Sequence, residues 1–519
     1  MRASTNTPPP IPRLPPEEES PATLVMVPGS KAAKVGQGTL QTLVDNVDLD
    51  ILVGVDPYPQ GLRGMAPKDA SLPIFLGRAT DGPKYTPINS AQTGILALPS
   101  NSQEAELSKS VEQAEPTVEA QHNLTDCQAV CVITPDISLS VSPQERSTTL
   151  DGIEEYASRL PPALRGPSVT HLSTNLRVGF STTYRQNEGN EDAIYIAGIG
   201  TSQANLGAAR NSEDPTATII NQFSNGVTRV NSIDLDAFGV QSVHGVGPSR
   251  HKTLQKAGLS TLSDIADTSP KLLADLSGIA SKTAAAIHAR ATARVNGTIQ
   301  PIGTDTLPTD DPVFIDIETD GLSPSTAWLI GVLDGGSEEG RYLTFREQEP
   351  GDGSHLEAFL MWLTGPAQGR PVVAWNGYDF DFPVIKDQLQ THHPERVSDW
   401  ERCFQFDALW WATQKDGGNA ALPGRTNKLE DVATALGWEP SVTGVDGATV
   451  AAIYSAYQTH TAVDSQSHRT PDWDRLERYC EDDVRALATI YEHLQQATED
   501  NQSVPPSMNT NQGSLSDFC

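Results

Sequence analysis

Residues 314–319 form a short apolar segment that carries two carboxylates, Asp316 and Glu318, and ends before Gly321. β-Branched apolar residues bounded by turn residues predict a buried strand. Side chains alternate along a strand, so Asp316 and Glu318 point to the same side. Two neighbouring acids at the end of a core strand repel each other and are costly to bury unless a cation neutralises them. The segment therefore predicts a site for a divalent metal ion, provided that further acids converge on it.

A second group of polar residues follows a predicted strand at residues 371–375. Asn376 comes first, and Asp379 and Asp381 follow at the start of a predicted helix. The dipole of a helix favours a carboxylate at its N-terminus, although a lone Asp there is usually only a helix cap. On this pattern alone, Asp379 and Asp381 are rival candidates for a catalytic acid.

The last predicted helix spans residues 473–496 and has an apolar stripe at helical spacing. Tyr479 and Asp483 are four residues apart, so they lie one turn from each other beside that stripe. An acid at the border of a buried stripe, with a phenol one turn away, suits a metal site with an oriented water. A surface Asp beside a Tyr at the edge of the core explains the pair equally well.

The elements around these residues predict an α/β arrangement. Residues 326–334 and 340–345 continue the acidic strand as an antiparallel meander, and residues 356–363 predict a helix before the fourth strand. These elements are expected to bring the three groups of candidate residues to one place.

Residues 243–297 contain two similar apolar-x-Gly-apolar turns between short predicted helices. Glycine at Gly245, Gly247 and Gly278 lets the backbone approach a phosphate, and the helix that follows offers free N–H groups. The segment is also basic within an acidic chain, with Lys252 and Lys282 close to the turns. Two ordinary helical hairpins with glycine turns are the alternative interpretation.

Taken together, the acidic segments resemble the three motifs of the DEDD 3′–5′ exonucleases, the DnaQ-like branch of the ribonuclease H-like superfamily. The third motif is similar to that of the branch with tyrosine rather than histidine, and the family's spacing favours Asp381 over Asp379. The motifs are Asp316-x-Glu318, Asn376-x-x-x-Phe380-Asp381 and Tyr479-x-x-x-Asp483. Residues 427–433 also resemble the helix that packs between the later motifs of the family, and we interpret that helix as structural. The glycine turns likewise resemble a tandem helix-hairpin-helix module, which binds duplex backbones without reading sequence.

The resemblance implies a fold, cofactors and roles for individual residues. The fold is a mixed ribonuclease H-like sheet flanked by helices, and the cofactors are two Mg²⁺ or Mn²⁺ ions about 3.5–4 Å apart. Tyr479 would orient the attacking water, Thr319 and Leu322 would contact the terminal nucleotide, and Asn376 would contact its backbone. The implied metal ligands are Asp316, Glu318, Asp381 and Asp483.

Composition and turn signals divide the chain into predicted segments around a β-rich or α+β N-terminal region, a small all-α domain and an α/β domain. The expected order is a disordered leader (1–37), a small β-rich unit (38–97), a linker (98–124), an α+β region of unknown role (125–240), the helix-hairpin-helix domain (243–297), a linker (298–311), the exonuclease domain (312–496) and a disordered tail (497–519).

The charge balance of the chain is strongly acidic. It has 66 Asp and Glu against 36 Lys and Arg, a net charge of −30. This composition is typical of haloarchaeal proteins that work in molar salt, although an acidic mesophilic protein is the alternative. No apolar run approaches a membrane span and no signal peptide is evident, so we expect a cytoplasmic protein without a membrane partner.

The leading functional hypothesis is a metal-dependent nuclease with 3′–5′ exonuclease activity. DNA is the favoured nucleic acid because helix-hairpin-helix modules bind duplexes, and RNA remains an alternative. A structure-specific endonuclease for branched DNA and a catalytically inactive nucleic-acid-binding scaffold are the other two hypotheses. Neither protein partners nor an oligomeric state follows from the sequence.

Overall fold

The computed structural model of the chain describes residues 238–414, 418–462 and 470–503 and, before residue 238, mainly the strands and helices named below. The chain divides into two compact units. Unit 1 contains residues 1–261 and 441–471, and unit 2 contains residues 262–440 and 472–519. In the described part of the chain, no helix combines the length and apolar character needed to cross a membrane.

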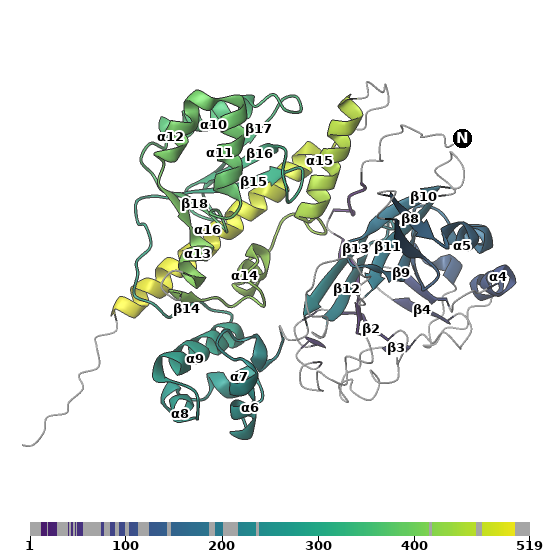
Figure 1. Ribbon diagram of the computed structural model, residues 1–519, viewed down its shortest axis with the longest axis horizontal. Coiled ribbons are helices and arrows are strands. Elements are labelled where there is room, and N and C mark those ends of the chain that lie inside the picture. The colour runs from purple at the N-terminus through teal and green to yellow at the C-terminus, as the bar shows by residue number, and fades with distance from the viewer. Residues whose placement is uncertain are drawn as a thin grey trace, which may run out of the picture. The chain divides into compact units, whose positions relative to one another are not determined.

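Unit 1 contains two mixed β-sheets (Figure 1). In the first, β1, β2 and β3 are parallel, β12 is antiparallel to β1, and β13 is antiparallel to β12. In the second, four parallel strands have an antiparallel strand at each edge. The first sheet is β13 (Thr228–Asp234), β12 (Thr216–Gln222), β1 (Ala22–Met26), β2 (Ile51–Gly54) and β3 (Ile74–Leu76). The second is β10 (Ser181–Arg185), β11 (Ala193–Gly200), β9 (Val169–Arg177), β6 (Ala129–Thr134), β5 (Thr93–Ala97) and β4 (Lys84–Ile88).

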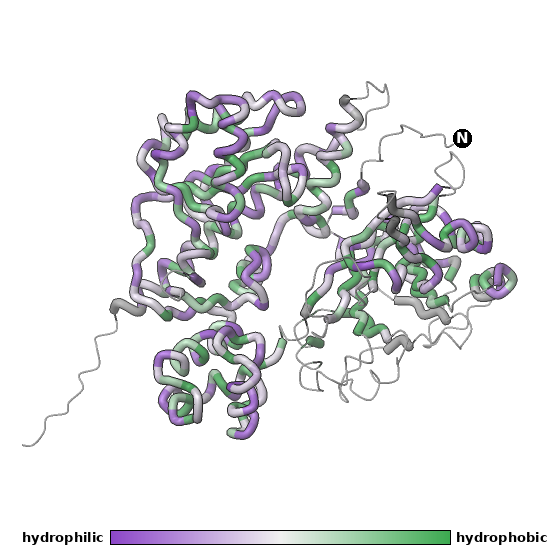
Figure 2. The backbone as a smooth tube through the Cα atoms, in the orientation of Figure 1, coloured by the Kyte–Doolittle hydropathy of each residue, from purple (hydrophilic) through white to green (hydrophobic). Residues whose placement is uncertain are grey.

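The two sheets of unit 1 pack face to face. Leu24 and Ile220 of the first sheet lie in one buried cluster with Ile95 and Ile133 of the second. The opposite face of the second sheet packs against helices through a separate apolar cluster, and Figure 2 shows hydrophobic strands beside more hydrophilic helices. The other elements of unit 1 are α4 (Glu104–Glu112), η1 (Leu124–Asp126), the hairpin β7 (Ser138–Ser142) and β8 (Ser147–Asp151), α5 (Ile153–Arg159), η2 (Pro162–Leu164), η5 (Val240–Ser242), α6 (Pro248–Lys256) and α15 (Gly447–Ala462).

Three predictions about the N-terminal region are wrong. The expected leader contains β1, which is buried between β12 and β2, and the expected linker at 98–124 contains α4. The expected β-rich unit at 38–97 is not separate, because its strand β5 pairs with β6 of the expected α+β region. Parallel pairing joins segments that are distant in sequence, so local composition gave no sign of it.

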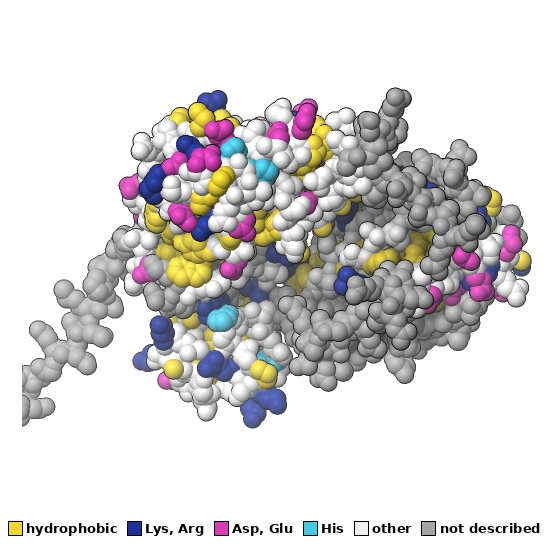
Figure 3. Space-filling view, turned by 45° about the horizontal axis from the view of Figure 1, so that its top comes forward, with side chains coloured by type: hydrophobic (Ala, Val, Ile, Leu, Met, Phe, Trp, Pro, Cys, Tyr) yellow, Lys and Arg dark blue, Asp and Glu magenta, His cyan; other side chains and the backbone are white. Residues whose placement is uncertain are grey.

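The predicted helix-hairpin-helix segment consists of short helices joined by glycine turns. After α6 come α7 (Leu262–Ala266), α8 (Pro270–Ala274) and α9 (Ser281–Asn296). Gly245 and Gly278 have φ values of 99° and 83°, which favour glycine. Lys and Arg side chains are prominent on the surface of this helical segment (Figure 3). The boundary between the two units falls within the segment, at residues 261 and 262.

Unit 2 is built on a five-stranded sheet in which β15 is central. The predicted meander is confirmed, because β16 is antiparallel to both β15 and β17. On the other side, β18 and β19 extend the sheet in parallel. The strand order is β17 (Arg341–Arg346), β16 (Ala327–Asp334), β15 (Val313–Thr319), β18 (Val372–Ala374) and β19 (Gln405–Asp407). The remaining helices are α10 (Ser354–Thr364), α11 (Asp381–His392), η6 (Pro394–Arg396), α12 (Val397–Glu401), α13 (Ala408–Thr413), α14 (Leu429–Ala435) and α16 (Trp473–Ser503).

Two boundaries of the predicted exonuclease domain also differ from the structure. The expected linker at 298–311 contains β14 (Gln300–Pro301), which pairs with β20 (Ala420–Ala421). Helix α16 continues to Ser503, beyond the expected start of the tail. Pairing between β14 and β20 depends on residues more than a hundred positions away, which the local pattern does not reveal.

Candidate active site

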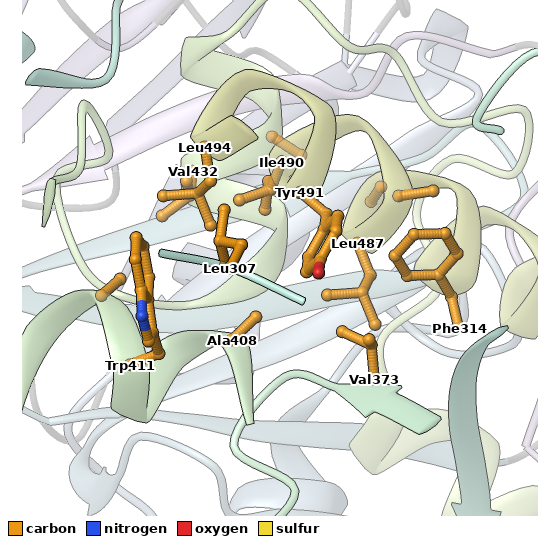
Figure 4. Close-up of a cluster of buried hydrophobic side chains, with 14 of the residues drawn as sticks. Leu307, Phe314, Val373, Ala408, Trp411, Val432, Leu487, Ile490, Tyr491 and Leu494 are labelled. Atoms are coloured by element: carbon orange, nitrogen blue, oxygen red, sulfur yellow. The ribbon is translucent and has the colours of Figure 1, made fainter. Parts of the chain in front are cut away.

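Alternation along β15 sends the acids and the neighbouring apolar residues to defined faces of the sheet. Val313, Ile315 and Ile317 belong to one core cluster. Phe314 lies on the same face of β15 as Asp316 and Glu318. It belongs to the cluster that packs α16 against the sheet (Figure 4). The ring of Phe314 contacts that of Tyr491 on α16, with ring centres 5.4 Å apart. The two acids of β15 therefore lie on the face that α16 covers.

The environment of the β15 acids penalises negative charge. Burial raises the pKa of Asp316 well above its usual value, and the charges of Asp483, Glu318 and Asp381 raise it further. Burial likewise raises the pKa of Glu318, and the charges of Asp483 and Asp381 raise it further. The predicted acids are thus close enough to repel one another, although they come from β15, α11 and α16.

The structure distinguishes the two rival acids before and at the start of α11. Asp381 is its first residue and is only 5% exposed, whereas Asp379 is exposed. Burial raises the pKa of Asp381, and hydrogen bonds from the N–H groups of Asp381 itself and of Ile317 oppose that rise. The bond from Ile317 places the carboxylate of Asp381 beside the acidic part of β15.

Helix α16 contributes the last predicted pair. The Tyr479 hydroxyl and the Asp483 carboxylate form a hydrogen bond that lowers the pKa of Asp483, while burial and the charges of Glu430, Asp482 and Asp381 raise it. Burial, followed by the charge of Asp483, raises the pKa of Tyr479 well above its usual value. Tyr479 therefore remains a neutral phenol beside the acids.

Two residues near the acids were not predicted as part of the site. The Cys480 Sγ lies 3.7 Å from Asp316 Oδ2, and burial raises the pKa of this thiol well above its usual value. Cys480 therefore stays protonated and donates to Asp316. Glu430 of α14, which lies in the helix interpreted as structural, is a fifth acid whose charge acts on Asp483. The sequence gave no signal for either, because both depend on how the helices pack.

A third unpredicted residue, Asp407, organises the loop that carries Asn376. Its carboxylate accepts hydrogen bonds from the backbone N–H groups of Asn376 (3.2 Å), Tyr378 (3.0 Å) and Trp410 (2.9 Å). Asn376 has a φ of 63°, an uncommon conformation for a residue other than glycine. Asp407 is 2% exposed. It therefore fixes the path of the chain into Asp381.

If the site hydrolyses nucleic acid as the sequence predicts, replacing Asp407 with Ala should slow that hydrolysis by about 10–100-fold. This is the usual effect of removing a group that orients metal ligands. Three backbone N–H groups would lose their acceptor, and the loop before Asp381 would loosen. Steady-state rates measured against metal concentration test this prediction. Asp387→Asn, on the exposed side of α11, is the control, and unchanged rates in Asp407→Ala would contradict the positioning role.

The predicted substrate contacts lie around the end of β15 and in the Asn376 loop. The Thr319 hydroxyl hydrogen-bonds within its own turn, to the carbonyl of Gly321 at 3.0 Å. The Leu322 side chain is 94% exposed, so it is accessible to a ligand. Asn376 is partly buried. Their contacts with a nucleotide remain predictions.

The predicted phosphate-binding residues are on the surface of the helical segment. Lys252, Lys282, Gly247 and Gly278 are exposed, and Gly245 is partly buried. The first residues of α6 and α9 have no side-chain cap, so their N–H groups are not satisfied by a capping side chain. Arg294 at the end of α9 is partly buried, and burial lowers its pKa to about 10, at which it still carries its positive charge at neutral pH.

The acids fit the divalent ions that the sequence predicts. The ligand atoms of Asp316, Glu318 and Cys480 lie within 4.8 Å of one another, and Asp381 and Asp483 add two carboxylates to the same electrostatic group. Oxygen ligands suit Mg²⁺ and Mn²⁺, whereas a protonated thiol does not. The four carboxylates are therefore the residues that would hold metal.

Comparisons with known proteins match two segments of the chain to known families. The chain has no match among curated proteins. Among solved structures it is similar to E. coli Exonuclease I in complex with a dA16 oligonucleotide, with 16% identity and a TM-score of 0.19, over 32% of this chain and 42% of that chain. Residues 239–292 match the family described as a SAM-like helix-hairpin-helix tandem. Residues 313–495 match the RNase_H superfamily, so the C-terminal part of the chain carries a domain of that superfamily.

Proposed function

We propose that the protein is a metal-dependent nuclease that removes nucleotides from the 3′ end of nucleic acid by a two-metal mechanism. The observation that carries this proposal is the convergence of four acids: the charges of Asp381 and Asp483 raise the pKa values of both Asp316 and Glu318. Clustered buried carboxylates are stable as anions beside cations. The match to the RNase_H superfamily supports nuclease chemistry for this site.

In this mechanism the protein side chains hold the metal ions, balance their charge and orient the attacking water. Bound Mg²⁺ or Mn²⁺ would supply a water of lowered pKa and would stabilise the leaving oxygen. The positions of the metal ions would be set by the carboxylates of Asp316, Glu318, Asp381 and Asp483. The Tyr479 hydroxyl hydrogen-bonds with Asp483, and we infer that it also orients the attacking water. The Cys480 thiol donates to Asp316 and so restrains its carboxylate.

Digestion of matched DNA and RNA oligonucleotides, labelled at either end, tests the proposal in buffer with high KCl and Mn²⁺. A 3′–5′ exonuclease shortens the free 3′ end stepwise and stops at a blocked 3′ end. Stepwise loss from the 5′ end would overturn the polarity. A wild-type protein inert in both Mg²⁺ and Mn²⁺, but still bound to nucleic acid, would instead favour the scaffold hypothesis.

The helix-hairpin-helix match supports a second candidate, a structure-specific endonuclease for branched DNA. Its backbone-binding turns would hold a duplex while the acidic site cuts at a junction or flap. Branched substrates with every 3′ end blocked separate the two candidates. Cutting of such substrates at the junction favours the endonuclease, and their complete resistance favours the exonuclease.

Replacing Gly247 with Ala should weaken duplex binding about tenfold, or about 1.4 kcal/mol, without destabilising the fold. Gly247 has a φ of −79°, and a Cβ there meets nothing within 4 Å. A methyl group is therefore harmless to the protein but would stand between a phosphate and the N-terminus of α6. Fluorescence anisotropy measures binding, with Gln255→Ala on the exposed end of α6 as control. Unchanged affinity in Gly247→Ala would argue against a phosphate contact.

A further inference from the structure

A second group of potential metal ligands lies in unit 2, in the loop between β17 and α10. It consists of Glu347 directly after β17, Asp352 in the loop and His355 in the first turn of α10. The ligand atoms that these side chains offer lie within 4.8 Å of one another. None of the three belongs to the carboxylate group of β15, α11 and α16.

Two atoms of this group are buried acceptors without a donor. Glu347 and His355 are each 4% exposed. The Gly351 N–H donates to Glu347 Oε2 at 2.9 Å, whereas Glu347 Oε1 has no hydrogen-bond partner. His355 Nδ1 also has none. Leaving buried polar atoms unsatisfied is costly, so a group that accepts their lone pairs would stabilise this loop.

The second nitrogen of His355 determines which atom is available to a ligand. His355 Nε2 lies 2.7 Å from the backbone oxygen of Ala327, and a carbonyl oxygen only accepts, so Nε2 carries the proton. Nδ1 of the neutral ring therefore has a free lone pair. Metal-binding histidines are commonly oriented in this way, with the other ring nitrogen donating to a carbonyl or carboxylate.

The groups around Glu347 Oε1 and His355 Nδ1 favour a bound cation between these two acceptors. Asp352 adds a second carboxylate, although both of its oxygens already accept hydrogen bonds from Gln348, Glu349 and Ser354. One imidazole nitrogen with carboxylate oxygens is a donor set that Zn²⁺ accepts readily.

We propose that Glu347 and His355, with Asp352 at the periphery, bind one Zn²⁺ ion. Glu347 also donates its backbone N–H to Trp328 at 3.0 Å, and His355 contacts Ala327. An ion between them therefore joins the end of β17 and the start of α10 to the start of β16. The site does not depend on the proposed nuclease function.

Zn²⁺ titration of the full chain tests the proposal in a background that carries Asp316→Asn and Asp483→Asn. These substitutions weaken metal binding at the acidic site, so that binding elsewhere becomes measurable. Equilibrium dialysis is expected to find one Zn²⁺ per chain, and Zn²⁺ is expected to raise the melting temperature. Adding His355→Gln or the isosteric Glu347→Gln should weaken binding at least about tenfold and abolish the thermal shift.

A matched control is available in the same unit. His288 also hydrogen-bonds a backbone carbonyl through Nε2, that of Ala266 at 3.1 Å, and it belongs to none of the potential metal groups found in the described residues. His288→Gln should leave Zn²⁺ binding unchanged. Two results would overturn the proposal: background protein that binds no Zn²⁺ at micromolar concentrations, or undiminished binding in folded Glu347→Gln protein. The first would mean that Glu347 and His355 share a proton instead.

Discussion

Replacing Asp381 with Asn is expected to reduce phosphodiester hydrolysis at least about 10³-fold, beyond the 10–100-fold effect of groups that only orient a ligand. The change keeps the shape of the side chain but removes one of four charges that would hold divalent metal. Asp381 lies against β15, where Ile317 donates to it, so the loss falls at the reacting centre. Nucleic-acid binding through the helical segment should persist, because it uses other residues.

Asp379→Asn is the matched control for this experiment. Asp379 is exposed and two residues away, so its replacement should leave cleavage within about twofold, as expected for a surface substitution of less than about 0.5 kcal/mol. Single-turnover cleavage and anisotropy measured in parallel separate catalysis from binding. Equal losses of cleavage activity in the two variants would mean that Asp381 is not a metal ligand. Full cleavage activity in Asp381→Asn would remove the central premise of the proposed function.

Replacing Asp483 with Asn should stabilise the metal-free protein by about 1–2 kcal/mol, or roughly 2–8 °C for a domain of this size. The pKa of Asp483 is raised by burial and by the charges of Glu430, Asp482 and Asp381, so removing its charge relieves repulsion. The same variant should lose most of the stabilisation that saturating Mn²⁺ gives the wild type, about 2.7 kcal/mol at a hundred times the Kd.

Thermal melts in EDTA and in Mn²⁺ distinguish this effect from a general change in stability. Asp474→Asn lies on the same helix but is exposed, and it should change neither melt by more than about 0.5 kcal/mol. If Asp483→Asn instead destabilised the metal-free protein, Asp483 would be a structural acid held by hydrogen bonds rather than a residue suited to binding metal.

The sequence predicted the acidic elements well because short-range geometry determines them. Alternation along a strand places Asp316 and Glu318 on one face, and a four-residue spacing places Tyr479 one turn from Asp483. The meander of β15, β16 and β17 was also predictable, since each strand follows the last in sequence. The roles of these residues in catalysis remain predictions until the variants are measured.

The sequence could not predict what depends on distant segments. Asp407 became part of the site only because β19 lies beside β18 and brings its carboxylate under the Asn376 loop. Glu430 and Cys480 act on the acids through the packing of α14 and α16 in unit 2. In unit 1, β1 is a core strand only because β12 and β2 flank it.

The sequence by itself therefore determined which carboxylates stand on which strand or helix, because a residue's neighbours along the chain define its face. Only the tertiary structure decided that acids from β15, α11 and α16 meet, which of Asp379 and Asp381 is buried, and which further residues restrain them. Electrostatic repulsion and burial depend on distances through space, and no local pattern of residues specifies those distances.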